Sequence, residues 1–259
     1  VINTCAVREH AEQRVLGNLG ALVHVKRRHP EQIICVCGCM AQEPHMAQKI
    51  KDSYRQVDLV FGPHALWRFP ELLYRLVTRR GRIFDIADEP GSIAEGIPLV
   101  RQEGVKAWVS IMYGCNNFCT YCIIPYLRGP YRSVPMEQLL EEARQLAQGG
   151  VKELILVAQE TTLYGKDIYG EKSLPKLLHE LAQIPGIQWI RIQYCYPEEI
   201  TDGLIEAIRT EEKVCHYLDI PIQHASNRIL KRMGRRTNRE ELTERIAKLR
   251  REIPDIALR

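Results

Sequence analysis

Three cysteines lie close together near the middle of the chain, in the segment Gly114-Cys115-Asn116-Asn117-Phe118-Cys119-Thr120-Tyr121-Cys122. Three thiolates on one short loop can bind a single metal centre. A structural zinc ion requires four ligands in a closed tetrahedron, and no fourth cysteine or histidine follows at the spacing of a zinc finger. Three sulfur ligands suit a 4Fe–4S cluster in which one iron keeps an open coordination position. The alternatives are a zinc knuckle and three thiols that only pack in a core.

A second group of cysteines lies near the start of the chain. Cys5 follows the apolar run Val1-Ile2-Asn3-Thr4, and Cys39 follows the run Ile33-Ile34-Cys35-Val36-Cys37. If both runs are parallel strands of one sheet, the two cysteines leave it at the same edge, where ligands collect in open α/β folds. Alternate residues of a strand share a face, so Cys37 could replace a ligand if the strand extends to Cys39. The alternative for Cys5 and Cys39 is burial as thiols in a small core.

The elements that must position these cysteines follow from apolar runs that alternate with amphipathic stretches. Residues 1–84 are predicted to form a small α/β domain. Residues 85–104, which contain prolines and glycines, are predicted to be a linker. Residues 105–259 are predicted to form a second domain that repeats a strand–helix unit. Short buried strands are predicted in the first domain at 33–37 and 57–61, with a helix at 11–25. In the second domain strands are predicted at 107–113, 153–158, 188–194 and 216–222, and helices at 136–148, 174–184 and 201–210.

The predicted fold class is therefore α/β. A small Rossmann-like N-terminal domain precedes a partial (β/α) barrel of the TIM type, in which right-handed crossovers place the working loops at the carboxyl ends of the strands. The cysteine triplet follows the first barrel strand, where such barrels carry their chemistry. Both ends of the chain are expected to be cut, because it opens on Val1 inside one apolar run and closes on Arg259 inside another.

Composition indicates a globular protein and excludes disorder, collagen and coiled coil. The chain has 259 residues, 45% hydrophobic and 26% charged, and its nine cysteines are an odd number, which favours reduced thiols over a disulfide framework. No apolar run approaches the roughly 18 residues that a membrane span requires, and no signal peptide precedes Val1, so a cytoplasmic location is expected. A net charge of +4 is too small to prove a nucleic-acid partner.

Polar residues at the predicted strand ends are candidates for binding. Gln159 and Glu160 follow the second barrel strand, and Gln223 and His224 are predicted to end the fourth. Arg128 and Arg132, which follow the cysteine loop, could pair with a carboxylate or a phosphate of the substrate. From residue 228 to 251 ten basic residues accompany three acidic ones, which predicts either a surface for RNA or an acidic protein, or a solvated helix face.

The cysteine spacing, with the aromatic Tyr121 before the last cysteine, resembles that of the radical S-adenosylmethionine (radical SAM) superfamily. The resemblance implies a 4Fe–4S cluster on Cys115, Cys119 and Cys122. It also implies that SAM, bound at the open iron, is cleaved to a radical that removes a hydrogen atom from a carbon. In this family Gln159, Glu160, Tyr121 and Gln223 would contact the cofactor, with Arg132, Arg128 and His224 left for the substrate.

The first domain resembles the N-terminal domain of the methylthiotransferases in its Asn3-Thr4-Cys5 and Cys37-Gly38-Cys39-Met40-Ala41-Gln42 motifs and in Arg8-Glu9-His10. The resemblance implies a second, auxiliary 4Fe–4S cluster in which Cys5 and Cys39 are two of three ligands. The third ligand would lie upstream of Val1, so this cluster is incomplete in the chain. Domain 1–84 would then be the auxiliary-cluster domain and 105–259 the radical SAM core.

The two halves are similar to different methylthiotransferases. Residues 1–122 resemble the MiaB type, which modifies an adenosine of tRNA. From Arg128 onward, motifs such as Tyr131-Arg132-Ser133-Val134-Pro135 and Gln159-Glu160-Thr161-Thr162 resemble the RimO type, which modifies an aspartate of a small-subunit ribosomal protein. The change falls near 119–128, which predicts either a recombinant or mis-assembled reading frame or a natural intermediate subfamily.

The function implied by the resemblance is insertion of sulfur and a methyl group into a C–H bond of the translation machinery. The RimO-type target is slightly favoured because the walls of the barrel mouth come from the second half. A low-potential electron donor such as flavodoxin or ferredoxin would be required. The alternatives are the tRNA target, a chain that binds clusters without being active, and a zinc-stabilised nucleic-acid-binding module without redox chemistry.

Overall fold

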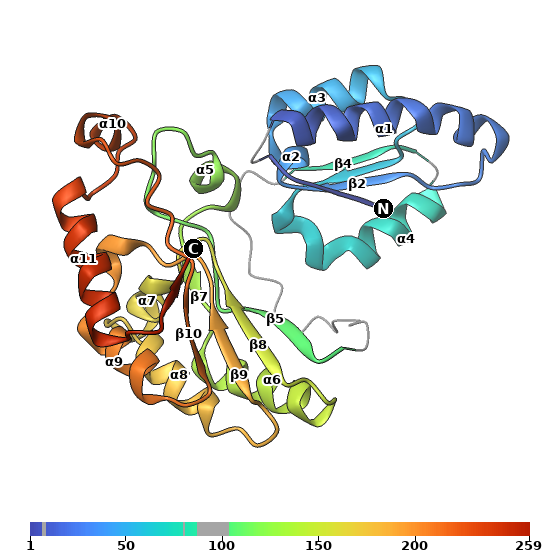
Figure 1. The fold of residues 1–259 in the computed structure, drawn as a ribbon. Helices are drawn as coiled ribbons and strands as arrows, with labels where there is room; N and C mark the ends of the chain where they lie inside the picture. Colours follow the sequence, from blue (N-terminus) through green and yellow to red (C-terminus); the bar gives the residue numbers. More distant parts are fainter. Residues whose placement is uncertain (7–8, 80, 87–103) are drawn as a thin grey trace. The chain divides into compact units, whose positions relative to one another are not determined.

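A computed structural model describes residues 1–6, 9–79, 81–86 and 104–259 (Figure 1). These residues form two compact units, Val1–Leu99 with Cys122–Gly129, and Val100–Tyr121 with Pro130–Arg259. The segment Cys122–Gly129 thus groups with the first unit, although the sequence places it within the second predicted domain. Arg8 and most of the predicted linker 85–104 lie outside the described residues.

The first unit is built on a four-stranded parallel sheet in the order β1-β2-β3-β4. Strands and helices alternate along the chain, as the sequence predicts. The strands are β1 (Ile2–Thr4), β2 (Cys35–Gly38), β3 (Leu59–Phe61) and β4 (Ile83–Asp85). The helices are α1 (Glu9–Arg28), α2 (Cys39–Gln42), α3 (Pro44–Ser53), the 3-10 helix η1 (Pro63–Arg68) and α4 (Phe69–Arg79).

Helices cover both faces of this sheet, with α1 and α3 on one face and α4 on the other (Figure 1). Leu19 of α1 and Ile50 of α3 are fully buried in one core, while Leu72 of α4 packs with Leu59 and Phe61 in the other. Because both faces are covered, the central strands β2 and β3 are buried along almost their whole length instead of on alternate residues. This is the three-layer arrangement expected of a Rossmann-like domain.

The second unit contains a five-stranded parallel sheet in the order β11-β10-β9-β8-β5, and a two-stranded antiparallel pair. The parallel strands are β5 (Lys106–Ser110), β8 (Glu153–Val157), β9 (Trp189–Ile192), β10 (Val214–Leu218) and β11 (Ala257–Leu258), and the pair is β6 (Met112–Tyr113) with β7 (Arg132–Ser133). The helices of at least six residues are α6 (Met136–Gln148), α8 (Leu174–Ala182), α9 (Asp202–Thr210), α10 (Asn227–Arg232) and α11 (Arg239–Glu252).

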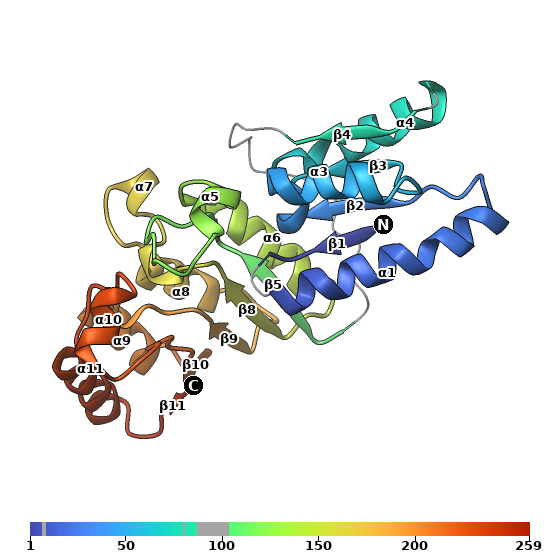
Figure 2. The ribbon, with the colours of Figure 1, turned by 90° about the horizontal axis from the view of Figure 1, so that it is seen from above.

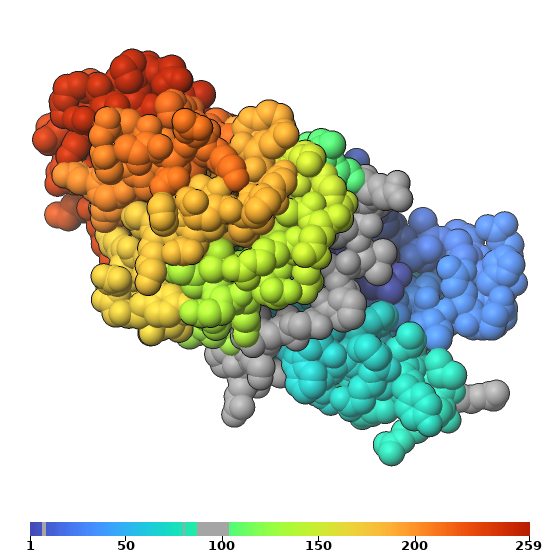
Figure 3. Space-filling model, turned by 90° about the horizontal axis from the view of Figure 1, so that it is seen from below, coloured from blue at the N-terminus to red at the C-terminus, as the bar shows by residue number. Residues whose placement is uncertain are grey.

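Helices α6, α8, α9 and α11 lie along one side of the curved sheet of the second unit (Figures 1 and 2). One large core joins them to the strands: Leu139, Leu177 and Ile208 of the helices pack with Leu154 and Ile190 of the strands. The outer surface passes from α6 through α8 and α9 to α11 in chain order (Figure 3). The partial (β/α) barrel predicted from the sequence is confirmed.

Short connecting elements complete the two units. They are α5 (Ile124–Arg128), α7 (Lys166–Tyr169), and the 3-10 helices η2 (Thr161–Leu163) and η3 (Pro197–Glu199). Helix boundaries follow local signals: the Thr201 side chain accepts a hydrogen bond from the Leu204 backbone and starts α9, and Asn238 with Glu241 forms a capping box at α11. No helix within the described ranges is long and apolar enough to cross a membrane.

Two predicted strand boundaries were wrong. The strand predicted at 107–113 ends at Ser110, because the chain then turns into the antiparallel pair of β6 with β7. The strand predicted at 216–222 ends at Leu218, although the apolar residues continue to Ile222. Pro221 carries no N–H group and cannot extend the ladder there.

Candidate functional site

The cysteine loop leaves β6 through Gly114, whose φ of 77° favours glycine. Cys115 and Cys119 are both 5% exposed, and Phe118 between them has a positive φ of 46°, which folds the loop tightly. Cys122 is partly exposed and begins the segment that groups with the first unit. None of the nine cysteines forms a disulfide. The loop therefore holds three thiols that form no disulfide, two of which are shielded from water.

The backbone of the loop is fixed by distant parts of the second unit. The Thr120 N–H donates to the Met233 carbonyl at 3.0 Å, and the Thr120 hydroxyl donates to the Arg232 carbonyl at 2.9 Å. On the other side, the Asn116 side chain accepts from the Tyr131 N–H at 3.0 Å. The position of the thiols thus depends on the turn that follows α10 as well as on the sheet.

A tyrosine and an arginine lie against the loop, and the sequence analysis assigned neither to the site. The Tyr196 hydroxyl is 3.7 Å from Cys119 Sγ, and the Arg235 guanidinium lies 4.1 Å from the centre of the Tyr196 ring. The Arg235 side chain is fully buried. Tyr196 could have been noticed through the motif Tyr194–Pro197, which follows β9. Arg235 could not, because in the sequence it is one of many basic residues.

The segment after β8 brings two predicted cofactor residues beside the cysteine loop. Glu160 is 1% exposed, and its carboxylate accepts hydrogen bonds from Thr162 and from the Asn117 side chain, the latter at 3.3 Å. Gln159 Oε1 is buried and has no hydrogen-bond partner. A buried amide oxygen without a partner is costly, so it favours a ligand that would donate to it.

Burial raises the pKa of Glu160 to about 7, against hydrogen bonds from Thr162, Tyr196 and Asn117 that lower it. A folded-state pKa above the ordinary 4.5 means that the folded protein binds more protons than the unfolded chain between those two values. Stability then falls as pH rises from 4.5 to 7. We expect the wild type to lose up to about 3 kcal/mol more than Glu160→Gln over this range, at 1.36 kcal/mol per pKa unit. Urea unfolding of both proteins at several pH values measures this difference, and equal pH profiles would contradict it.

Four other predicted residues are placed less favourably. Gln223 and His224 were predicted to end a strand, but they lie in the exposed loop after β10. His224 Nδ1 accepts from the Ser226 N–H at 2.9 Å, which is a local loop contact. Gln223 has a positive φ of 64°. Arg132 lies on β7, partly buried. Tyr121 is half exposed, and burial together with Cys119 raises its pKa to about 12.

In the first unit Cys5 and Cys39 follow neighbouring strands at matching positions. β1 and β2 are parallel, and Thr4 pairs with Gly38, so each cysteine is the next residue after a paired one. Cys5 is exposed, whereas Cys39 is 3% exposed and starts α2. The guanidinium of Arg128, which belongs to the same compact unit, donates from Nε to Cys39 Sγ at 3.2 Å. Arg128 is therefore placed beside a candidate ligand.

Cys35 and Cys37 are separate from this arrangement. Both lie on β2 and pack in the core under α4, with Leu72. The strand ends at Gly38, so the condition under which Cys37 could replace a ligand is not met. Burial raises the pKa of both thiols, which keeps them protonated and unreactive.

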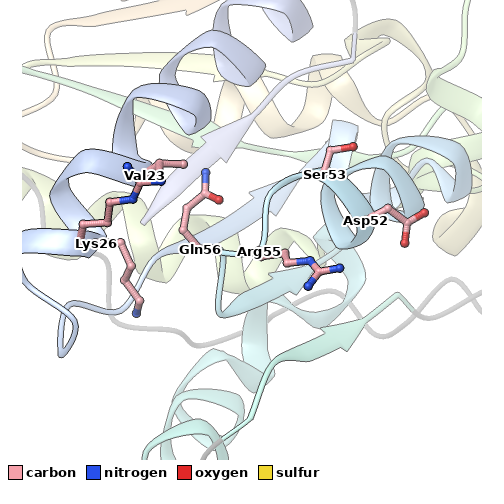
Figure 4. A pocket seen from close by; sticks show the side chains of 7 residues that line it. Val23, Lys26, Asp52, Ser53, Arg55 and Gln56 are labelled. Atoms are coloured by element: carbon pink, nitrogen blue, oxygen red, sulfur yellow. The ribbon is translucent and has the colours of Figure 1, made fainter.

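A pocket of about 390 Å³ opens in the first unit between α1 and α3 (Figure 4). Its lining includes Lys26, whose Nζ forms a 2.9 Å ion pair with Asp58 just before β3. It therefore lies towards the amino ends of the strands, whereas Cys5 and Cys39 follow the carboxyl ends. Within the described parts of the chain, no three His, Cys, Asp or Glu side chains are close enough to hold a single metal ion.

In a comparison with known proteins, two family models match different parts of the chain. Residues 109–258 match the family described as the radical SAM superfamily, and residues 1–62 match the uncharacterized protein family UPF0004. Among solved structures, the cobalamin-dependent S-adenosylmethionine radical enzyme OxsB has a TM-score of 0.64 at 13% identity, over 99% of this chain and 39% of that one. The radical S-adenosylmethionine methyltransferase TsrM from Kitasatospora setae has a TM-score of 0.64 at 15% identity, over 97% and 54%. At such identities these likenesses concern the fold alone.

Curated relatives are more similar in sequence. The tRNA-2-methylthio-N(6)-dimethylallyladenosine synthase of Acetivibrio thermocellus is 48% identical over 258 residues, and the ribosomal protein uS12 methylthiotransferase RimO of Lachnoclostridium phytofermentans is 48% identical over 260 residues. Both alignments cover 100% of this chain, but only 54% and 58% of the relatives, so the chain spans little more than half of their length. With its core matched over residues 109–258 and methylthiotransferases similar to it along its whole length, the chain belongs to the radical SAM superfamily.

Proposed function

We propose that this chain is part of a radical SAM methylthiotransferase acting on the translation machinery. The observation that carries the proposal is the loop with three cysteines outside any disulfide, Cys115, Cys119 and Cys122, in the part of the chain that matches the superfamily. Membership of the superfamily implies SAM and one 4Fe–4S cluster. Relatives of both target types, similar along the whole chain, support the methylthiotransferase assignment.

The residues present fit these groups. A 4Fe–4S cluster takes one thiolate at each of three irons, so its ligands stand farther apart than those of a single ion. The two thiols of the second unit are shielded from water, and Gln159 Oε1 offers a buried acceptor without a partner after the neighbouring strand. When bound, the cluster and SAM together supply a carbon-centred radical that removes a hydrogen atom from the substrate.

Individual residues have separate tasks in this proposal. Gln159 accepts a hydrogen bond from the amine of the methionine part of SAM. Glu160 positions the cysteine loop through its hydrogen bond from the Asn117 side chain. Tyr121 and Gln223 border the cofactor, and Arg132 and His224 face the substrate. Each of these groups binds or positions, while the cofactor carries the reactive chemistry.

The first unit would hold the auxiliary cluster, with Cys5 and Cys39 as two of its ligands. We assign Arg128 to this cluster instead of to the substrate, because its Nε donates a hydrogen bond to Cys39 Sγ at 3.2 Å. A guanidinium N–H can donate a hydrogen bond to a sulfur that ligates iron. The low-potential electron donor would be a flavodoxin or a ferredoxin, and the enzyme would act in the cytoplasm.

For the target, we propose the aspartate of a small-subunit ribosomal protein first, because the second unit carries the RimO-type motifs and forms the barrel. The tRNA adenosine is the second candidate, supported by the relative from Acetivibrio thermocellus at equal identity. Mass spectrometry of tRNA nucleosides and of small-subunit ribosomal proteins, from a strain lacking the full-length gene, tests both. Loss of one SCH2 unit from the ribosomal protein supports the first target, loss from the nucleosides replaces it with the second, and loss from neither rejects the function.

A further inference from the structure

Arg235 is the one basic residue of the segment 228–251 whose side chain is fully buried. Its Nη2 donates to Glu198 Oε2 at 3.1 Å and to the Pro221 carbonyl at 3.2 Å. Its Nε and Nη1 are buried without a hydrogen-bond partner. A buried cation that leaves two donors unpaired costs stability, and surface solvation cannot explain its place in the fold.

The turn that carries Arg235 is also the turn that holds the cysteine loop. Thr120 donates from its backbone to the Met233 carbonyl and from its hydroxyl to the Arg232 carbonyl. A side chain at Gly234, whose φ is 70°, would lie 3.7 Å from the Phe118 carbonyl oxygen. Residues 232–235 are therefore packed directly on residues 118–120. The backbone that carries Arg235 is thus held against the cysteine loop, and burial together with the hydrogen bonds to Glu198 and Pro221 holds its guanidinium in place.

Tyr196 contacts both the Arg235 guanidinium and the Cys119 thiol. The guanidinium lies over the Tyr196 ring at 4.1 Å from its centre, and the hydroxyl of that ring is 3.7 Å from Cys119 Sγ. Cys119 and Tyr121 both interact electrostatically with Arg235. Hydrogen bonds to ligand sulfurs and nearby positive charge both favour the form of an iron–sulfur cluster that carries the extra electron.

We infer that Arg235, acting through Tyr196, raises the reduction potential of the cluster held by Cys119. The inference rests on the proposed function, because it requires a cluster on the cysteine loop. The step concerned is the gain of one electron by the oxidised cluster from a one-electron donor, with no bond made or broken. The extra negative charge is offset by the buried guanidinium, and the Tyr196 hydroxyl strengthens its hydrogen bond to the sulfur. Arg235 thus acts on the cluster through its positive charge and through Tyr196, and it does not touch the substrate.

The test is a potentiometric titration of the reconstituted 259-residue chain, followed by electron paramagnetic resonance in the absence of SAM. All proteins carry Cys5→Ala and Cys39→Ala, so that the only expected cluster lies on the cysteine loop. For Arg235→Gln we expect the reduced-to-oxidised ratio at a fixed potential to fall about tenfold, which for one electron corresponds to about 59 mV. Arg235→Lys keeps the charge and should recover most of this shift, and Tyr196→Phe should move the potential in the same direction as Arg235→Gln.

Arg236→Gln is the matched control, since Arg236 is the exposed neighbour and its loss should leave the potential unchanged. An unchanged potential in Arg235→Gln overturns the inference. If Arg235→Gln binds no iron, an unchanged potential in Tyr196→Phe overturns it. So does an equal shift in Arg236→Gln, which would show a general surface effect. A parent protein that binds no iron and sulfide rejects the proposed function itself, which keeps the two failures distinct.

Discussion

Replacing Cys119 by alanine is expected to remove the 4Fe–4S cluster from the cysteine loop. Cys119 is 5% exposed, and Thr120 beside it is tied to the turn at 232–233, so no other thiol can move into its place without breaking those bonds. After anaerobic reconstitution, we expect iron and sulfide to fall by about four atoms each per chain. Reductive cleavage of SAM should fall by more than about a hundredfold. Loss of a cluster ligand should lower activity more than loss of a residue that only hydrogen-bonds to a ligand.

Cys195→Ala is the control for Cys119→Ala. Cys195 is also buried, but its Sγ contacts the Thr161 hydroxyl at 3.5 Å and burial raises the pKa of its thiol to about 12. Its loss should leave the iron content and the cleavage of SAM close to those of the parent. Full iron and visible absorption in Cys119→Ala would refute the assignment of the loop, and a colourless parent protein that holds one zinc ion would replace it with the zinc module.

The second large effect is expected from Gly38→Ala in the first unit. Gly38 has a φ of 96° and separates β2 from Cys39. A Cβ there would lie 2.4 Å from the Thr4 carbonyl oxygen and 2.8 Å from the Thr4 nitrogen, which are backbone atoms of the paired strand. Backbone strain and this overlap together should lower the free energy of unfolding of the first unit by about 3 kcal/mol or more. Urea unfolding followed by circular dichroism measures the loss.

Gly20→Ala provides a control of the same type in the same unit. Gly20 lies in α1, and a Cβ there would meet no atom within 4 Å. Because alanine favours a helix over glycine by about 1 kcal/mol, this substitution should stabilise the unit. Equal effects of the two substitutions would mean that the approach of Gly38 to Thr4 does not exist in solution.

The pattern of apolar residues was sufficient to predict most of the secondary structure. Residues 153–157 and 136–148 fall where the period of the sequence places a strand and a helix. The pair of β6 with β7 was missed, because a two-residue strand has no periodicity to read. The end of β10 was misplaced for the opposite reason: Ile220 and Ile222 continue the apolar pattern past Leu218, where the strand ends. Apolar composition records burial, whereas a strand also needs regular backbone pairing, which Pro221 cannot continue because it has no N–H.

The candidate ligands were predicted from spacing alone, since three cysteines within eight residues can meet without help from the rest of the fold. To predict that Cys5 and Cys39 lie close together required one further inference, that neighbouring parallel strands end at the same edge of a sheet. The pairing of Thr4 with Gly38 agrees with this inference. That these positions hold clusters stays a prediction. The same reasoning could not find partners that are distant in the sequence and carry no motif of their own.

By itself, the sequence determined the alternation of strands and helices, the superfamily and the candidate thiols, because each of these depends on residue types at short, regular spacings. Only the tertiary structure decided which of many arginines is buried, that Tyr196 reaches Cys119, and that Arg128 donates to Cys39. Arg235 stands 116 positions after Cys119 in the chain, and only the packing of residues 232–235 on 118–120 brings the two together. Contacts of this kind depend on where each element lies in space, which local residue patterns do not encode.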